Sequence, residues 1–325
     1  MRQTRTMNSA ERFDEVWVAG DVLIDLIPQS SGADAKRTPV VGGGGANTTK
    51  ALARLGINTH FIDGISTDSH GQLSRKELTD SGVNLDRAVT MSQPTATAEV
   101  TLALDGSAEY RFSLEGTATF DFREDWLRKG EPTVLHLGTL ATIIEPGCDA
   151  LFRWANSIHA PKVFDPNVRP SVLSDRSRYR DKVEKWIAIS DVIKFSEDDL
   201  FWLYPEVSNM NQAIDFAQEI LPSGPSLVVI TRGEAGIVGI STEQVIEVSS
   251  VAAKIIDTVG AGDTVGAILV EGLYTFGVDE IRGKRLQSTL ERAAKAASIT
   301  CSRAGAQPPK LAELGPLNRS EKETT

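Results

Sequence analysis

The chain has 325 residues, two cysteines and a formal net charge of −10. This length is typical of one large domain with a substantial core, and the proportions of hydrophobic residues (41%) and charged residues (24%) are those of a folded soluble protein. The 44 acidic residues outnumber the 34 basic ones, which disfavours nucleic acid and anionic membranes as partners, because both bind basic surfaces. We expect neither of them as a partner.

The cysteine content and the lack of a long apolar stretch predict a cytoplasmic protein. The first residues are polar and lack the apolar stretch of a signal peptide, and no run of about 18 apolar residues occurs. Cys148 and Cys301 form no CxxC pair and no disulfide framework. We expect a single domain over residues 12–312, with flexible termini at 1–11 and 313–325.

The first predicted elements are strands and helices in alternation. VWVAGDVLIDLI (residues 16–27) predicts a buried strand, a kink at Gly20-Asp21 and a continuation. Four glycines then precede a helix that ends at Gly56, and the strand HFIDGIS is followed by a helix that ends at Gly82. These elements predict the start of an α/β domain.

The middle of the chain contains one hairpin pattern. The run TATAEVTLALDGSAEYRFSL alternates apolar and polar residues around Asp105-Gly106, a strong hairpin signal. The later runs TVLHLGTL, PKVFDPN, DVIKFS and LVVITRG are instead continuously apolar and alternate with helical or turn-rich sequence. This alternation predicts a mostly parallel sheet with helices on both faces, and the hairpin is expected to form a small β element outside it.

Two glycine-rich turns stand before predicted helices, at residues 42–45 and 260–262. Such turns either serve only as tight turns or hold an anion such as phosphate at a helix N-terminus. No GxxxxGK[ST] run exists, and Gly260, Gly262 and Gly266 have the spacing GxGxxxG instead of the dinucleotide spacing GxGxxG. The sequence therefore disfavours a P-loop fold and a nicotinamide-dependent oxidoreductase.

Asp263 follows the second of these turns directly. A carboxylate at this position either caps the helix or acts as a base beside an anion hole formed by Gly260, Ala261 and Gly262. The second interpretation describes a phosphoryl-transfer site, where the carboxylate takes a proton from a hydroxyl and the amides receive the charge on the phosphate.

Several motifs occur together and in order over residues 16–309. They are DTVGAGD (residues 257–263), a GGxxxN turn (Gly42, Gly43 and Asn47), GDVLIDLIP, FDPNVRP, VVITRGEAG and TCSRAGAQPP. With this set the sequence resembles the ribokinase-like (PfkB-type) carbohydrate kinases, and especially the bacterial fructokinases among them. The resemblance implies a doubly wound α/β fold with a small β-sheet lid, roughly at residues 28–41 and 92–116, through which two subunits would pair as a homodimer.

The resemblance also implies roles for single residues. Asp263 would be the general base, with the anion hole supplied by Gly260, Ala261 and Gly262. The residues expected to contact the sugar are Asp21, Gly43, Asn47 and Arg169, and those expected to contact ATP are Ser196, Thr231, Gly233 and Gly236. Asp199 would hold Mg²⁺ through water, and Asp257 and Thr258 would hold a monovalent cation such as K⁺. The family's NxxE motif falls here on Ser196 and Asp199, which is a departure from its pattern.

The expected activity is ATP-dependent phosphorylation of a small sugar, with fructose as the first choice. Ribose, 2-keto-3-deoxygluconate and a nucleoside such as aminoimidazole riboside remain alternatives. A hypothesis of another class is a non-catalytic sensor of sugar or nucleotide.

Overall fold

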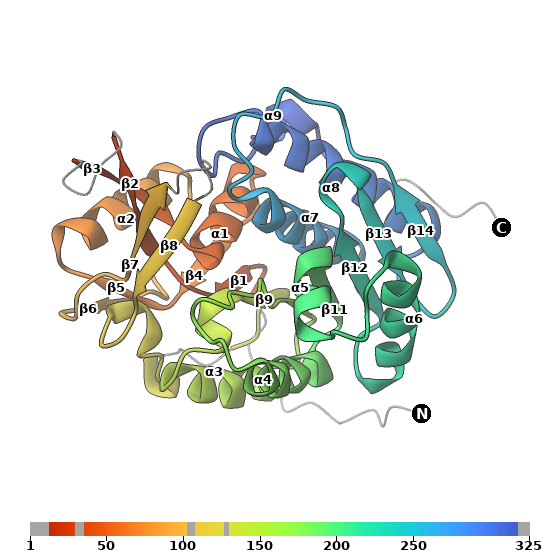
Figure 1. Ribbon diagram of the computed structural model, residues 1–325, viewed down its shortest axis with the longest axis horizontal. Coiled ribbons are helices and arrows are strands. Elements are labelled where there is room, and N and C mark those ends of the chain that lie inside the picture. The colour runs from red at the N-terminus through yellow and green to blue at the C-terminus, as the bar shows by residue number, and fades with distance from the viewer. Residues whose placement is uncertain (1–12, 30–35, 103–107, 127–129, 318–325) are drawn as a thin grey trace.

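The computed structural model describes residues 13–29, 36–102, 108–126 and 130–317. Figure 1 shows a large central sheet with helices on both faces and a smaller sheet at one side. The large sheet has the strand order β14-β13-β12-β11-β10-β9-β1-β4. Its strands are β1 (Val16–Ala19), β4 (Thr59–Ile62), β9 (Val134–Gly138), β10 (Lys162–Asp165), β11 (Val192–Ser196), β12 (Leu227–Thr231), β13 (Ile237–Ile240) and β14 (Val245–Val248).

Six of these eight strands are parallel to their neighbours, from β4 through to β12, and β13 and β14 add an antiparallel edge. The prediction of a mostly parallel α/β sheet is therefore confirmed. In such a sheet the carboxyl ends of the strands lie along one edge, which is where ligand sites are found.

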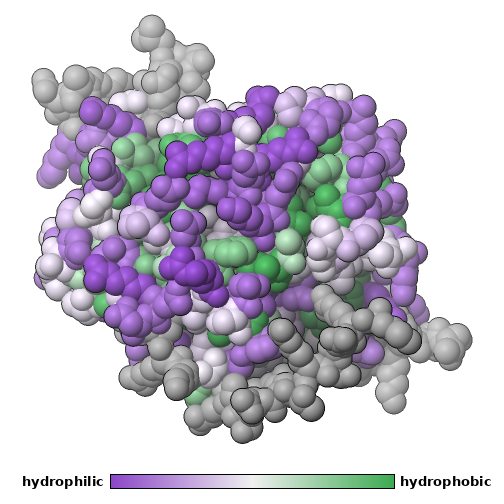
Figure 2. Space-filling view, turned by 90° about the horizontal axis from the view of Figure 1, so that it is seen from below, coloured by the Kyte–Doolittle hydropathy of each residue, from purple (hydrophilic) through white to green (hydrophobic). Residues whose placement is uncertain are grey.

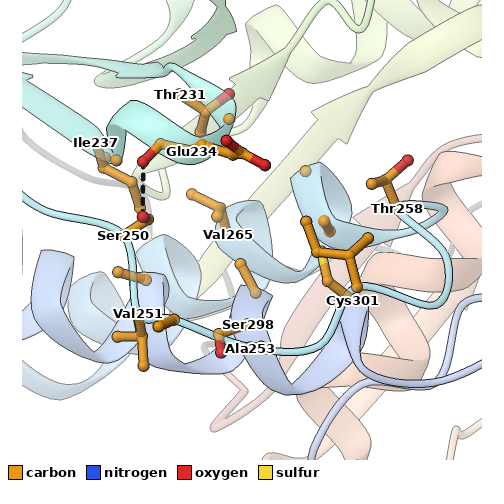
Figure 3. A pocket seen from close by; sticks show the side chains of 18 residues that line it. Thr231, Glu234, Ile237, Ser250, Val251, Ala253, Thr258, Val265, Ser298 and Cys301 are labelled. Carbon is orange, nitrogen blue, oxygen red and sulfur yellow. Dashed lines mark hydrogen bonds between the residues drawn. The ribbon is translucent and has the colours of Figure 1, made fainter.

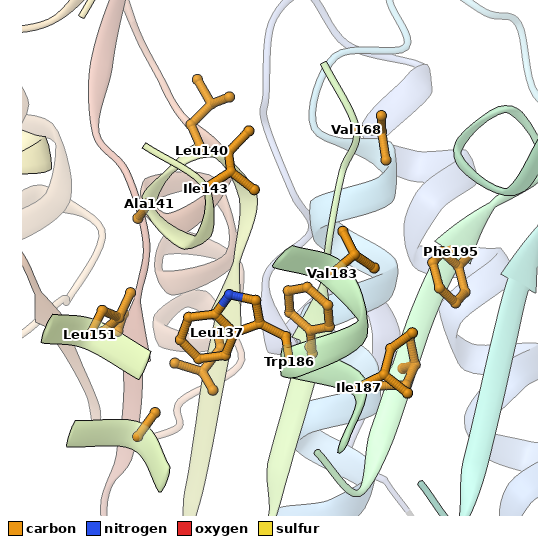
Figure 4. Packing of buried hydrophobic residues seen from close by; sticks show 14 of the residues in the cluster. Leu137, Leu140, Ala141, Ile143, Leu151, Val168, Val183, Trp186, Ile187 and Phe195 are labelled. Atoms are coloured by element: carbon orange, nitrogen blue, oxygen red, sulfur yellow. The ribbon is translucent and has the colours of Figure 1, made fainter. Parts of the chain in front are cut away.

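Helices cover both faces because the parallel strands bury side chains on both sides. One face packs on α1 (Gly44–Arg54), α7 (Ala261–Phe276) and α8 (Gly283–Cys301). The other packs on α3 (Gly147–Ser157), α4 (Arg176–Ile189), α5 (Glu197–Leu203) and α6 (Met210–Ile220). Figure 4 shows part of this second core, where Val183, Trp186 and Ile187 of α4 lie over Leu137 and Phe195 of the sheet.

The small sheet is the predicted lid. It has the order β3-β2-β7-β8 and consists of β2 (Leu23–Pro28), β3 (Arg37–Gly42), β7 (Thr97–Leu102) and β8 (Ala108–Ser113). The prediction began the lid at residue 28, whereas the structure begins its first strand at Leu23. Asp105-Gly106, the predicted hairpin turn, lies outside the described residues.

The segment VWVAGDVLIDLI is divided between the two sheets, so that β1 belongs to the large sheet and β2 to the lid. The change of direction falls at Gly20, where a Cβ atom would lie 2.8 Å from the Cα atom of Gly45. This close approach of two glycines brings the start of α1 against the end of β1.

The segment HFIDGIS, predicted as one strand, is also divided. Its first half is β4, and its second half, β5 (Gly64–Ser66), pairs with β6 (Val89–Met91) in a separate two-stranded sheet. The division falls at Asp63, whose buried carboxylate accepts a hydrogen bond from the Gly64 amide at 2.7 Å.

The remaining helices are α2 (Ser69–Asp80), which the Asp68 side chain caps, and the short α9 (Leu311–Leu314). Within the described ranges, no helix has the length and apolar character needed to cross a membrane. The face seen in Figure 2 is mostly hydrophilic, with smaller apolar areas between the polar groups.

Candidate active site

Two cavities lie at the carboxyl edge of the large sheet, and they share Thr258 and Gly262 in their walls. We call them the polar cavity, of about 410 Å³, and the apolar cavity, of about 580 Å³. The polar cavity is lined by Asp21, Leu23, Asp25, Gly43, Gly44, Asn47, Phe112, Thr139, Leu140, Asn167, Arg169, Thr258, Val259, Gly260, Gly262 and Asp263. Seven of the eight predicted sugar-binding and catalytic residues line this cavity, all except Ala261, and residues of the small sheet line it too.

Asp263 stands in the first turn of α7 and faces the polar cavity, where it is only 7% exposed. Its Oδ2 atom accepts a hydrogen bond from Asn47 Nδ2 at 2.9 Å. Burial and the charge of Asp165 raise the pKa of Asp263, whereas the Asn47 bond and the charges of Lys194 and Arg169 lower it. No ion pair engages this carboxylate within the described part of the chain, so it is available to a ligand.

The turn before α7 brings amide groups into the same wall. Gly260 has φ = 77°, a left-handed conformation that favours glycine. The Ala261 amide donates to the Thr258 carbonyl at 3.2 Å, whereas the Gly260 and Gly262 amides have no acceptor among the residues that the structure describes. Two of the three predicted anion-hole amides are therefore unpaired, and the Ala261 amide is already paired.

Asp21 is buried and connects two backbone segments. Its Oδ2 atom accepts from the Gly44 amide at 3.2 Å, and its Oδ1 atom accepts from the Leu140 amide at 3.1 Å. Burial raises the pKa of Asp21 to about 7. The carboxylate thus holds the glycine-rich turn against the segment after β9, in addition to lining the polar cavity.

Asp25 is a cavity residue that the sequence analysis did not single out. It lies on β2, and Leu23 and Asp25, two positions apart, line the cavity from the lid side. Burial raises the pKa of Asp25 to about 6, against the opposing charge of Arg169. The signal that could have found it is a carboxylate within a run that is otherwise apolar.

Arg169 enters the polar cavity from the loop after β10. Its Nη1 atom donates to the Val168 and Asn167 carbonyls at 3.0 and 3.3 Å. The loop is held from behind by Asp199, whose Oδ1 atom accepts from the Val168 amide at 2.7 Å. The second oxygen of Asp199 accepts from the Ser196 amide at 2.8 Å in a capping box at the start of α5.

Ser196 and Asp199 therefore support the Arg169 loop and line neither cavity. Within the described residues, no group of three or more His, Cys, Asp or Glu side chains has the arrangement of a metal site. The predicted magnesium role of Asp199 stays a prediction.

The apolar cavity lies between β12, the start of α7 and α8 (Figure 3). Thr231, Gly233 and Gly236, the three predicted nucleotide-binding residues of this loop, line one end. Gly236 has φ = 96°, and a Cβ atom there would lie 2.0 Å from the Val248 carbonyl oxygen. The remaining wall is mainly aliphatic, with Val251, Ala253, Ile255, Val265, Ala294, Ala297 and Cys301.

Asp257 connects the loop before α7 with the loop after α8. Its Oδ1 atom accepts from the Val259 amide at 3.0 Å, and its Oδ2 atom accepts from the Gly305 amide at 2.8 Å. Thr258 lines both cavities. This carboxylate thus joins the loop predicted to hold a monovalent cation to the loop after α8.

Residues 14–313 match the model of the pfkB family of carbohydrate kinases. The chain belongs to this family. It is 32% identical to a fructokinase of Rhizobium leguminosarum bv. trifolii over 85% of this chain and 83% of the relative.

Two solved structures are similar over nearly all of the chain. The fructokinase of Xylella fastidiosa with bound ATP matches with a TM-score of 0.80 and 24% identity, over 93% of this chain and 97% of the other. A double mutant of the Vibrio cholerae fructokinase, bound to fructose, ADP and potassium, matches with a TM-score of 0.77 and 25% identity, over 94% and 98%. The ribokinase-like fold is therefore confirmed.

As a member of the pfkB family, the protein is a phosphotransferase with a hydroxyl group as acceptor. The shared wall of the two cavities fits this chemistry, because a carboxylate and free amides lie where an acceptor and a phosphate would meet. The motif around Asp263 thus lies at the junction of the two cavities, and its catalytic role stays a prediction. Asp25 from the lid and the buried Asp165 and Lys194 behind the wall were missed.

Proposed function

We propose that the protein transfers the γ-phosphoryl group of ATP to a hydroxyl of a neutral sugar, with fructose as the first candidate. The observation that carries this proposal is the position of Asp263, which faces the polar cavity beside the wall that this cavity shares with the apolar one. The fructokinase names of the relatives support fructose as the acceptor.

Asp263 would accept the proton of the sugar hydroxyl and so make its oxygen nucleophilic toward the γ-phosphorus. Asn47 would hold this carboxylate in place through the bond to Oδ2. The free amides of Gly260 and Gly262 would stabilise the charge that develops on the phosphoryl oxygens. The N-terminus of α7 contributes a favourable dipole at the same place.

The apolar cavity is suited to a nucleotide. Aliphatic side chains such as Val251 and Ala297 would contact the adenine ring, and the loop of Thr231, Gly233 and Gly236 would lie along the ribose and phosphates. Mg²⁺ bound to ATP would neutralise phosphate charge. Oxygen ligands suit K⁺, and Asp257, Thr258 and the loop at residues 301–306 supply such atoms.

The charges of the polar cavity favour a neutral acceptor. Asp21, Asp25 and Asp263 line it, against Arg169 as the one cation in its described wall. This balance disfavours a sugar acid such as 2-keto-3-deoxygluconate, whose carboxylate would face three acidic groups. Ribose and aminoimidazole riboside lack this carboxylate, so they remain alternatives to fructose.

The test is a coupled ATP assay with fructose, ribose, 2-keto-3-deoxygluconate, adenosine and aminoimidazole riboside, each with and without K⁺. We expect the highest kcat/KM for fructose and a higher rate with K⁺. A clear preference for the sugar acid would contradict the argument from charge. No turnover with any of them, together with measurable sugar binding, would instead support a sensor.

We also propose that the lid pairs two subunits. Its outer strands β3 and β8 are the edges of a four-stranded sheet, and Ile27 on β2 is 41% exposed. Sedimentation analysis of the protein and of the Ile27→Asp variant would test this, since a lid-mediated homodimer should dissociate in the variant.

A further inference from the structure

Three buried polar side chains lie behind the active-site wall, on three adjacent parallel strands. They are His136 on β9, Asp165 on β10 and Lys194 on β11. Each follows by two positions a buried valine that packs in the core beneath α7, namely Val134, Val163 and Val192. All three strands therefore place a polar group on the α7 side, in a position where the rest of the strand is apolar.

Lys194 and Asp165 form a buried ion pair. Lys194 is 3% exposed, and its Nζ atom lies 2.8 Å from Asp165 Oδ2. Burial lowers the pKa of this lysine, but the charges of Asp165, Asp199 and Asp263 outweigh burial, so its pKa is raised and the ammonium stays charged. An ammonium group has three N–H donors, and Asp165 is its one acceptor within the described residues.

The ammonium lies directly behind Gly262. A Cβ atom on this glycine would be 3.1 Å from Lys194 Nζ, and Gly262 lines both cavities. The backbone of Gly262 is helical, so its conformation does not require glycine. The absence of a side chain there lets a positive charge approach the wall through which the phosphoryl group would pass.

The other neighbours of this charge are acidic or neutral. Asp263 lies on the next residue of α7, and Asp199 lies on α5. His136 is neutral, since burial and the charge of Lys194 lower its pKa to about 3. Neither of its ring nitrogens has a hydrogen-bond partner in the described structure. Lys194 is thus the cation of this buried group.

We propose that Lys194, fixed by Asp165, is a positioning residue for phosphoryl transfer: its permanent charge behind Gly262 favours negative charge both on Asp263 and on the phosphoryl group at the anion hole. A fixed charge in a buried site acts strongly because little solvent screens it. The inference rests on the proposed kinase function and explains why glycine stands at position 262.

A purely structural pair is the alternative, and variants separate the two. Lys194→Met removes the positive charge but leaves the Asp165 carboxylate buried without a counter-charge, which destabilises the folded protein. The double variant Lys194→Met/Asp165→Asn removes both charges, and the asparagine can still accept from the Asn167 amide, which lies 3.1 Å from Asp165 Oδ1. The matched control is Arg292→Met/Glu271→Gln, which removes a buried bidentate pair between α7 and α8.

With the sugar that the wild type prefers, we expect kcat of the double variant to fall about 10- to 100-fold while the KM for sugar changes less than about threefold. The control pair should keep kcat per folded molecule. A double variant within about twofold of the wild type would overturn the proposal. Failure of the wild type to phosphorylate any sugar would instead reject the proposed function, so the two failures are distinguishable.

The pH dependence of kcat/KM separates the two roles, because a purely structural ion pair would not change it. Lys194 lowers the pKa of Asp263 and Asp165 raises it. The acid limb of kcat/KM should therefore move to higher pH in Lys194→Met and to lower pH in Asp165→Asn. Arg169 also lowers the pKa of Asp263. Asp21 and Lys50 are charged groups that interact with Asp263 as well. Shifts of both variants in the same direction would contradict the proposal.

Discussion

The two cavities that meet at Gly262 are built in opposite ways. The polar cavity is lined by three carboxylates, two side-chain amides and a guanidinium, and burial raises the pKa of each of its three aspartates. The apolar cavity is walled by small aliphatic side chains on α7, α8 and the loop before α7.

This difference indicates that the polar cavity determines which sugar is accepted, whereas the apolar cavity mainly supplies affinity for the nucleotide. A site made of buried polar groups discriminates between ligands strongly, because a group left without its partner is costly. An apolar site contributes affinity in proportion to buried area and tolerates change. Substitutions should therefore act mainly on turnover and sugar affinity in the first cavity, and weakly on nucleotide affinity in the second.

The largest expected effect is that of Asp263→Asn. We expect kcat to fall about 10²- to 10⁴-fold, because the general base is lost, while sugar and nucleotide still bind. Steady-state kinetics and calorimetry would measure this, with Asp198→Asn on exposed α5 surface as the control. Near-normal turnover in the Asp263 variant would remove the carboxylate from the mechanism.

Asp25→Asn should have the next largest effect. The loss of a charged hydrogen-bond acceptor costs about 1.5–3 kcal/mol, so we expect the KM for sugar to rise about 10- to 100-fold. The KM for ATP should stay the same, because Asp25 lines only the polar cavity. Equal increases in both KM values would show that the lid acts on the two cavities as one.

The pH dependence of Asp25 comes third. Its pKa is raised from 3.8 to about 6, so the folded protein disfavours the ionised form. The resulting destabilisation is complete above pH 6 and absent below about pH 4. As the pH falls from 7 to 4.5, the wild type should therefore gain thermal stability relative to Asp25→Asn. Its sugar affinity should fall over the same range, because the Asp25 carboxylate becomes protonated. Melting curves and sugar titrations of both proteins would check the two opposite trends.

The smallest effect is expected from Ile255→Ala in the apolar cavity. Ile255 is 52% exposed, so it has only part of its surface left to bury on a ligand. We expect the KM for ATP to rise about two- to fivefold with kcat unchanged. A larger loss, or a change in sugar affinity, would mean that the two cavities are less independent than their linings indicate.

Local motifs predicted the fold and the residues that line the polar cavity. The glycine turns at residues 42–45 and 260–262, Asn47 and Asp263 are encoded by short stretches whose neighbours in sequence are also neighbours in space. Periodicity likewise predicted the parallel strands and placed the hairpin outside them.

The missed residues depend on contacts between distant segments. Lys194 and Asp165 are 29 residues apart, and only strand pairing brings them together. A charged residue inside an apolar strand was a visible signal, but its partner was not. Likewise, the kink at Gly20-Asp21 was predicted, but sequence patterns do not show that the strand after it, which carries Asp25, belongs to a different sheet.

The chain passes from β1 into β2 without an intervening helix, and this has a consequence for how the protein can change over evolution. Only three residues separate the end of β1 from the start of β2, and the close approach of the Gly20 and Gly45 backbones fixes that junction. A lid inherited in this way is not an exchangeable module. Substitutions that admit other sugars are therefore expected on β8, which contributes Phe112 to the polar cavity and is not continuous with β1.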